Sequence, residues 1–380
     1  MERQITLGDV IAPAKVLRCD NDDYSVLSMT MHDGIVLQSN RFKKSLVSID
    51  QSNYKVVLRG QLVVGFPIDE GVIYVQNIAE AGIMSPAYGV WNIHSKEILP
   101  EYLELCLHSP QSMDYYKNKL RGTTARRRSI TTGDLLALPI ILPSLTEQKR
   151  RIGLFRQTTL LLNSQKQTML KFDELVKSRF VEMFGGIHDS VLYPYMTVDS
   201  FTKVTSGGTP DRNTPSYWEN GKIRWVKTTE LQNCVICDTE EKITDEGVEN
   251  SSAKMVPANT ILIAMYGQGK TRGMTGYLAI EGATNQACAC ILPSEEINQR
   301  YLWQYMILSY DKLRSMAKGG NQPNLNAGII KSFPVLVPPL ELQNRFASFV
   351  SEVDKSKLAV KQSLEKLETL KKSLMQQYFG

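Results

Sequence analysis

The sequence has few of the residue patterns on which enzymes and membrane proteins depend. Its 380 residues include only four histidines, and none stands in a spacing typical of a metal site or of a nucleophile with its base. No apolar run approaches the ~20 residues that a membrane-spanning helix needs. Residues 1–4 (MERQ) have no secretory-signal character. We therefore expect a cytoplasmic protein with no membrane segment and no catalytic residues of its own.

The six cysteines have no disulfide-scaffold spacing, which agrees with a reducing compartment. Cys234 and Cys237, together with Cys288 and Cys290, could in principle supply four thiolates to a structural zinc ion. However, cysteine is a common buried residue, a C-x-C pair is not a favoured zinc-finger spacing, and the first half of the chain has no equivalent. We therefore predict no metal site.

Two motifs of methyl-transfer and nucleotide chemistry are also missing. No Asn/Asp-Pro-Pro-aromatic sequence occurs, and residues 337–340 (VPPL) lack both the amide or acid and the aromatic. Residues 264–271 (AMYGQGKT) are one residue away from a phosphate-binding P-loop, but a P-loop must lead into a helix. Residues 272–280 have the pattern of a turn and a strand, so we predict a glycine-rich basic hairpin that touches a phosphate backbone. The paired acids Glu240 and Glu241 are interpreted as solvated loop charges.

What the sequence does contain is a long internal repeat. Residues 130–185 align without a gap on residues 325–380, with 14 identities in 56 positions. A repeat of this period makes each copy a whole domain plus a helix rather than one unit of a solenoid. Such a chain suits a partner of two-fold character, for example a duplex or a pair of identical subunits.

Each copy ends in a predicted long helix. Residues 146–184 and 341–379 contain no proline, and both follow a short strand closed by prolines, at 139–143 and 334–338. Apolar residues recur every seven positions, which is typical of a coiled-coil seam. The seam residues are Phe155, Leu162, Met169, Val176 and Met183 in the first helix, and Val353, Val360, Leu367 and Leu374 in the second. We predict that the helices pack on each other, antiparallel; the alternative is two core helices, each on its own domain.

The predicted fold class is α+β. We expect two repeated α/β recognition domains, at 1–145 and 186–340, separated by two long antiparallel coiled-coil helices, at 146–185 and 341–380, with pseudo-two-fold symmetry.

This layout resembles the specificity (S) subunits of type I restriction-modification enzymes over essentially the whole chain. The most specific matches are residues 206–210 (SGGTP), Tyr217-Trp218, residues 223–231 (IRWVKTTEL), residues 320–340 and the final Phe379-Gly380. The first copy departs from this pattern, because it has no Gly-Gly-Thr-Pro segment and carries three arginines, 126–128, near the position of residues 322–324.

The resemblance implies a non-catalytic subunit without a cofactor, whose two target-recognition domains read an asymmetric bipartite DNA site. It implies that two methyltransferase (M) subunits bind S-adenosylmethionine and methylate N6 of adenine. It also implies that two nuclease/translocase (R) subunits, which use ATP and Mg²⁺, can join for cleavage. Two other classes stay open: a self-contained methyltransferase or nuclease, and a coiled-coil scaffold without a DNA role.

Duplex binding needs cations for phosphates and planar polar groups for base edges. Residues 117–128 concentrate six cations in 12 residues, residues 312–322 are their counterpart, and residues 270–272 lie on the predicted hairpin. The alternative for each cluster is a solvated basic face, and for the two aromatic residues a place in the core. The predicted DNA-binding residues are Lys119, Arg121, Arg126, Arg127, Arg128, Ser206, Gly207, Thr209, Tyr217, Trp218, Lys227, Thr228, Lys270, Thr271, Arg272, Lys318, Asn321 and Gln322.

Overall fold

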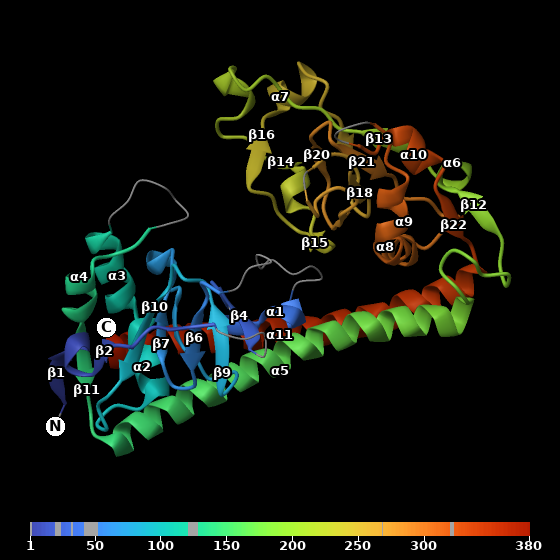
Figure 1. Cartoon of the computed structure of the whole chain (residues 1–380). Coiled ribbons are helices and arrows are strands. Elements are labelled where there is room, and N and C mark those ends of the chain that lie inside the picture. Colours follow the sequence, from blue (N-terminus) through green and yellow to red (C-terminus); the bar gives the residue numbers. More distant parts are fainter. Residues whose placement is uncertain are drawn as a thin grey trace. The chain divides into compact units, whose positions relative to one another are not determined.

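The structure, a computed structural model, describes residues 2–19, 24–31, 33–41, 52–120, 128–267, 269–319 and 323–380 (Figure 1). The chain divides into two compact units: unit 1 is Met1–Lys166 with Lys361–Gly380, and unit 2 is Gln167–Val360. Two helices of 40 residues, α5 (Leu145–Phe184) and α11 (Leu340–Phe379), each contribute one part to either unit. In the part of the chain that the structure describes, no helix is long and apolar enough to cross a membrane.

Unit 1 contains two small sheets and a separate strand pair. The first sheet has the order β2 (Ile11–Pro13), β10 (Gly89–Ile93), β7 (Leu62–Val64), β8 (Ile73–Val75). The second has the order β3 (Leu17–Arg18), β6 (Lys55–Leu58), β9 (Ala81–Met84), β4 (Ser25–Thr30), β5 (Gly34–Leu37). The strand pair is β1 (Arg3–Thr6) with β11 (Pro139–Leu142). The helices are α1 (Gln38–Arg41), α2 (Pro100–Leu107), α3 (Pro110–Lys119) and α4 (Thr132–Leu136), with the 3-10 helices η1 (Leu7–Asp9) and η2 (Ile68–Glu70).

Unit 2 is built in the same way. Its first sheet has the order β13 (Val204–Ser206), β21 (Cys288–Ile291), β18 (Ile261–Ala264), β19 (Thr275–Leu278), β15 (Cys234–Ile236). Its second has the order β16 (Glu241–Ile243), β14 (Ile223–Val226), β20 (Gly282–Thr284), β17 (Met255–Val256). The strand pair is β12 (Tyr195–Thr197) with β22 (Pro334–Leu336). The helices are α6 (Val198–Phe201), α7 (Asp245–Glu249), α8 (Gln299–Leu308), α9 (Tyr310–Ser315) and α10 (Ala327–Lys331), with η3 (Pro215–Tyr217) and η4 (Thr228–Glu230).

The strand orders show that the two units repeat one topology. The order β2-β10-β7-β8 matches β13-β21-β18-β19. In the second sheets the parallel pair β4–β9 matches β14–β20, and an antiparallel strand flanks each member of both pairs. Helices α2 to α5 follow in the same order as α8 to α11. The predicted duplication of an α+β module is therefore confirmed, and each long helix begins one residue before its predicted start.

The seven-residue seams of α5 and α11 lie on the covered faces of the helices. Phe155, Leu162 and Val176 are buried in α5, as is Val353 in α11. Within unit 2 the helices run antiparallel, because Asp173 meets Lys357 while Phe180, one heptad later, meets Phe346. Lys357 interrupts the apolar ladder, and its Nζ donates to Asp173 Oδ1 at 2.6 Å. The predicted packing of the two helices is confirmed within the unit.

Two identities of the sequence repeat make the same contacts in both modules. Gln148 and Gln343, at the starts of α5 and α11, are 0% and 1% exposed. Gln148 Oε1 accepts from the Leu99 amide and Gln343 Oε1 from the Asn298 amide, both at 2.8 Å, and these two amides belong to the N-cap residues of α2 and α8. Each glutamine thus fastens a long helix to the module that precedes it.

The far ends of the long helices complete the modules in an exchanged way. Phe379, which ends α11, packs on Tyr102 of unit 1, and Phe184, which ends α5, packs on Tyr301 of unit 2, with ring centroids 5.5 Å apart in both cases. Both tyrosine hydroxyls donate to a main-chain carbonyl of the proline-bounded strand. Each module is therefore closed by the helix of the other copy, as a pseudo-two-fold chain requires.

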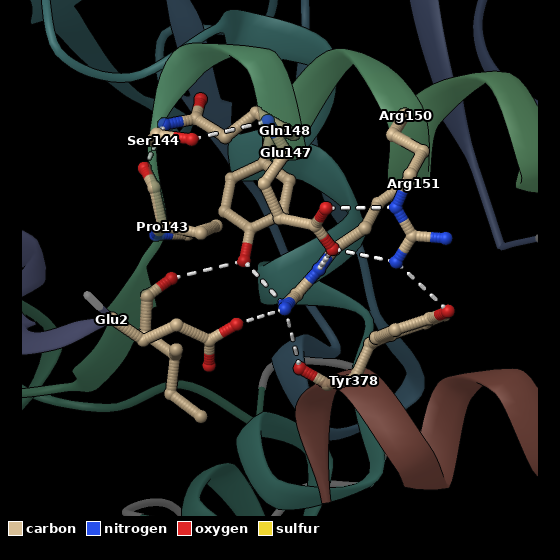
Figure 2. Close-up of polar contacts among 10 residues, drawn as sticks. Glu2, Pro143, Ser144, Glu147, Gln148, Arg150, Arg151 and Tyr378 are labelled. Atoms are coloured by element: carbon tan, nitrogen blue, oxygen red, sulfur yellow. Dashed lines mark hydrogen bonds and ion pairs between the residues drawn. The ribbon is translucent and has the colours of Figure 1, made fainter.

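A buried arginine distinguishes the junction of unit 1 (Figure 2). Arg151 is 4% exposed; its Nε donates to Glu147 Oε1 at 2.9 Å, and its guanidinium also pairs with Glu2. It donates in addition to the Tyr378 carbonyl at 3.2 Å and lies 4.6 Å from the centroid of the Tyr378 ring. Glu147 accepts two further bonds from Arg150, each at 2.7 Å.

The repeat places Phe346 where unit 1 has Arg151. Phe346 is fully buried, with ring centroids 5.5 Å from Phe180, 5.6 Å from Phe184 and 6.0 Å from Tyr301. The junction of unit 2 is therefore an aromatic cluster.

Candidate nucleic-acid interface

The predicted basic hairpin of unit 2 connects β18 and β19, the third and fourth strands of its sheet. It closes by main-chain bonds of 2.9 Å from Gly273 N to the Ala264 carbonyl and from Ala264 N to the Met274 carbonyl. Gly267, Gly269 and Gly273 have φ of 140°, 61° and 86°, which side chains other than glycine rarely adopt. A strand follows the hairpin, so the helix that a P-loop needs to bind phosphate is absent here, and the predicted hairpin is confirmed.

Residues of helix α9 hold this hairpin by its main chain. Arg314 donates to the carbonyls of Arg272 at 2.7 Å and Gly269 at 2.8 Å. Tyr310 donates from its hydroxyl to the Lys270 carbonyl at 2.6 Å. The charge of Arg314, which the sequence analysis grouped with the DNA-binding cations, is directed at the protein itself.

The hairpin also touches the loop between α9 and α10. Leu325 N donates to the Met265 carbonyl at 3.0 Å, and Arg272 donates from its guanidinium to the Pro323 carbonyl. Lys318 opposes Asn324 in a two-residue bridge at the base of that loop. The structure therefore brings two of the predicted clusters, 270–272 and 318, to neighbouring elements.

Two cations of this surface have no acidic partner. Lys270 and Lys318 are exposed, and neither forms an ion pair with any residue of the described ranges. An unpaired ammonium on an exposed loop can neutralise a phosphate and release its counterions. Thr271 lies beside them, half-buried.

Unit 1 has the equivalent pair of elements with different charges. The hairpin between β7 and β8 contains η2, whose Ile68 amide donates to the Arg128 carbonyl at 3.1 Å in the loop that precedes α4. Arg128 pairs with Asp69 Oδ2 at 3.0 Å and with Glu70. Its guanidinium is thus neutralised within the module and is not a free cation.

Several predicted residues lie outside the described ranges, namely Arg121, Arg126, Arg127, Asn321 and Gln322. Lys119 ends helix α3, with its Nζ 3.7 Å from Asp134 Oδ1 and half of its side chain exposed. A surface pair of this length is weak, so Lys119 can exchange that partner for a phosphate.

The Gly-Gly-Thr-Pro segment is held by close packing. A Cβ atom on Gly207 would lie 2.0 Å from the Thr284 carbonyl oxygen, and one on Gly208 would lie 2.3 Å from Ser252. Ser206 ends β13, opposite Ala289, and Thr209 donates to the Gln286 side chain. These residues join the two sheets of unit 2, and the hydrogen bond from Thr209 to the Gln286 side chain is exposed.

The aromatic pair Tyr217-Trp218 divides between two roles. Trp218 packs edge-on against Trp225, with centroids 5.1 Å apart, and donates from its indole to the Asp211 carbonyl at 2.9 Å. The Arg212 guanidinium lies 3.7 Å from the Trp218 ring centroid. Trp218 is therefore part of a small core, whereas Tyr217 ends η3 half-buried, with its carbonyl accepting from Thr244 N at 3.0 Å.

Of the two acids near Lys227, Glu240 is an exposed loop residue, as predicted, whereas Glu241 begins strand β16 and is half-buried. Lys227 Nζ lies 2.8 Å from Glu240 Oε2 and 3.0 Å from Glu241 Oε1, and Arg212 binds the second carboxylate. Hydrogen bonds to Glu240 and Glu241 raise the pKa of Lys227 above its ordinary value. Lys227 is thus already paired, and Thr228, the first residue of η4, is half-buried.

The four cysteines considered for zinc are divided by burial. Cys288 and Cys290 are fully buried in a hydrophobic cluster, whereas Cys234 and Cys237 are exposed. Burial raises the pKa of the Cys290 thiol to about 11, which opposes the thiolate form that zinc binds. Within the described ranges, no group of three or more acidic, histidine or cysteine side chains could hold a metal ion.

An open cavity of about 1390 Å³ lies in unit 1 between the module and the helix pair. Its lining mixes lysines and glutamates, among them Lys166, Lys371, Glu101 and Glu104, and includes none of the predicted DNA-binding residues. It is therefore separate from the hairpin and loop described above.

Three residues that contact or form the hairpins of the two modules were not predicted from the sequence: Tyr310 in unit 2, and Asp69 and Glu70 in unit 1. Tyr310 gave no signal, because an aromatic residue at a helix start is usually core. Asp69 and Glu70 could have been found as the only adjacent acids on the hairpin that corresponds to residues 265–274.

Comparison with known proteins agrees with this architecture. Residues 193–370 match the type I restriction modification DNA specificity domain. A specificity subunit of a type I restriction enzyme from Escherichia coli is 31% identical over 164 residues, which cover 42% of this chain and 40% of that protein. The matched part thus spans about two fifths of the length of the curated relatives.

Two solved structures share the fold along the whole chain. A chain of a structure on complex assembly and conformational transition of the type I R-M system aligns with a TM-score of 0.60 and 16% identity, covering 100% of this chain and 97% of that one. The S subunit of a type I restriction-modification system from M. genitalium aligns with a TM-score of 0.57 and 14% identity, covering 100% and 96%. Residues 193–370 thus match a type I restriction modification DNA specificity domain, and the whole chain shares its fold with these two structures.

Proposed function

We propose that this chain is the non-catalytic DNA-recognition subunit of a cytoplasmic type I restriction-modification system. Each module reads one half of an asymmetric bipartite duplex target. The observation that carries this proposal is the hairpin-and-loop surface, which both modules form from equivalent elements but furnish with different side chains. Such divergence is expected where two modules read different half-sites.

The long helices act as the spacer between half-sites in this proposal. A 40-residue helix is about 60 Å long at ~1.5 Å per residue. A rigid pair of that length sets the number of unread base pairs between the two halves.

The chemistry belongs to partner subunits. Two methyltransferase subunits supply S-adenosylmethionine and methylate N6 of adenine in each half-site, and two nuclease/translocase subunits, with ATP and Mg²⁺, join for cleavage. The match of residues 193–370 to a type I DNA specificity domain, and the similarity to a specificity subunit, support this division of labour. The DNA-contacting residues we favour are the exposed cations Lys270 and Lys318 in unit 2 and Lys119 in unit 1, together with Thr209, Tyr217 and Thr271 of unit 2.

Co-expression with the partner methyltransferase, followed by genome-wide sequencing of modified bases, tests the proposal. We expect a split motif with methyl-adenine in both halves. A stable complex that modifies nothing, and that shows no salt-dependent binding of duplex DNA, would instead favour a coiled-coil scaffold without a DNA role. Methyl transfer by the purified chain alone would reveal an enzyme.

Removing one heptad from each long helix tests the spacer. The deletion shortens the pair by about 10 Å, or roughly three base pairs of duplex. We expect a changed or abolished gap with both half-sites retained; an unchanged gap contradicts the spacer role.

A further inference from the structure

In both modules one arginine joins the hairpin to the loop beside it. In unit 2 the arginine is on the hairpin, where Arg272 donates to the Pro323 carbonyl of the loop. In unit 1 it is on the loop, where Arg128 pairs with Asp69 and Glu70 of the hairpin. Arg128 and Pro323 both lie just before the aligned segments of the repeat, so the two links meet equivalent loops, with the arginine on the loop in unit 1 and on the hairpin in unit 2.

Burial of the two guanidiniums is also alike. The Nε atoms of Arg128 and Arg272 are both buried without a hydrogen-bond partner. The part of each side chain up to Nε therefore lies inside the protein and does not extend into solvent. The Arg128 side chain is 31% exposed, against 48% for Lys119 in the same unit.

The charges argue against a direct phosphate contact by Arg128. One guanidinium facing two carboxylates leaves a local charge of −1 (+1 and −2), which repels a phosphate. Arg272 faces a carbonyl and keeps its charge, but its neighbour Lys270 is the more exposed cation of the hairpin.

We propose that Arg128 and Arg272 are positioning residues, each of which fastens the hairpin of its module to the loop that precedes α4 or α10, and that neither binds DNA. This inference rests on the proposed function. Its physical basis is that base recognition needs hydrogen-bond donors held in place to within a fraction of an ångström. A loop that is no longer held therefore loses sequence discrimination, while its cations still attract DNA.

The test in unit 2 compares Arg272→Gln with Lys270→Gln in the complex with the methyltransferase subunits. We expect Arg272→Gln to relax the half-site read by unit 2, roughly tenfold in discrimination. The dependence of duplex affinity on salt, measured on a duplex carrying the wild-type motif, stays as in wild type. We expect Lys270→Gln to do the reverse, with an intact motif and a salt slope smaller by about 0.9.

A lysine at position 272 serves as the rescue variant. Arg272→Lys keeps a donor for the Pro323 carbonyl and is expected to recover part of the discrimination. The half-site read by unit 1 reports on folding, because it must stay unchanged in every unit 2 variant. An intact motif in Arg272→Gln overturns the inference, whether or not the salt slope falls.

In unit 1, substitution of Glu70 tests the inference more directly than substitution of Arg128. If Arg128 bound phosphate, Glu70→Gln would remove one of its two acidic partners, leaving Asp69, and would tighten DNA binding. We expect Glu70→Gln to relax the unit 1 half-site as Arg128→Gln does, and the double variant to lose no more than either single change. Tighter binding with an unchanged motif contradicts the positioning role. A wild-type complex without sequence-dependent binding would refute the proposed function itself.

Discussion

The two junctions where a helix end closes a module come from one repeat but are stabilised differently. At the junction of unit 1, Arg151 lies among Glu147, Glu2 and Tyr378. At that of unit 2, the equivalent residue is Phe346, packed among aromatic rings. The position of Glu147 is occupied by Leu342 in the second copy, so both partners changed together.

The contacts around this difference are the same in both units. Gln148 and Gln343 bind the N-cap residues of the equivalent helices α2 and α8, and Phe379 and Phe184 pack on equivalent tyrosines. The shared contacts thus accommodate either a buried ion-pair network, as in unit 1, or an aromatic cluster, as in unit 2. In each junction the buried side chains have partners of their own kind. The difference predicts distinct responses to truncation and to pH.

The largest effect is expected from Phe346→Ala. Removing a fully buried ring that touches three others costs about 3–5 kcal/mol of unfolding free energy. Hydrogen exchange should show the loss of protection in unit 2. The control is Phe349→Ala, three residues away and only partly buried. Equal losses of unfolding free energy from the two variants would mean that the ring contacts of Phe346 add no stability beyond that of a partly buried phenylalanine.

A smaller effect is expected from Arg151→Met. The methionine keeps the apolar stem but removes the charged hydrogen bonds, at a cost of about 2 kcal/mol. The cost stays moderate because Glu2 and Glu147, with side chains 50% and 28% exposed, can be rehydrated. Exchange protection around α2 and the end of α11 measures it.

The reciprocal exchange sharpens this comparison. Arg151→Phe together with Glu147→Leu gives unit 1 the residues of unit 2, and we expect it to be neutral or stabilising, since apolar replacements of buried ion pairs usually are. A loss of unfolding free energy as large as that of Arg151→Met would show that unit 1 cannot replace its ion pairs by the apolar residues of unit 2.

The sequence predicted those features that depend on local periodicity. The seven-residue seams, the proline-bounded strands and the glycine-rich hairpin each leave a short-range pattern. The internal repeat then implied the common topology, because equivalent segments must bury equivalent faces.

Charge pairing could not be predicted in the same way. Arg150 and Arg151 are adjacent in sequence, yet the first is half-exposed and the second 4% exposed, since Glu2 and Tyr378 meet it from opposite ends of the chain. Lys227 and Arg128 look like free cations until the fold brings acids to them. Whether a basic residue is available to DNA is therefore a tertiary property.

The smallest effect concerns pH and separates the junctions chemically. Hydrogen bonds from Arg150 and then Arg151 lower the pKa of Glu147 from 4.5 to about 2. A lowered carboxyl pKa stabilises the folded state fully above about pH 4.5, and this contribution is lost as the pH falls towards 2. The titratable groups that contact Glu147 or Arg151 are Arg150, Glu2, Tyr102 and Tyr378, of which Glu2 is the other carboxyl. We expect exchange protection at the unit 1 junction, corrected for the intrinsic rate, to fall across this window. We expect Glu147→Gln to weaken this step. The aromatic junction around Phe346 has no carboxylate among its ring contacts and should lack this local step. An equal step at both junctions would show that the acid sensitivity belongs to the whole chain and not to the ionic filling.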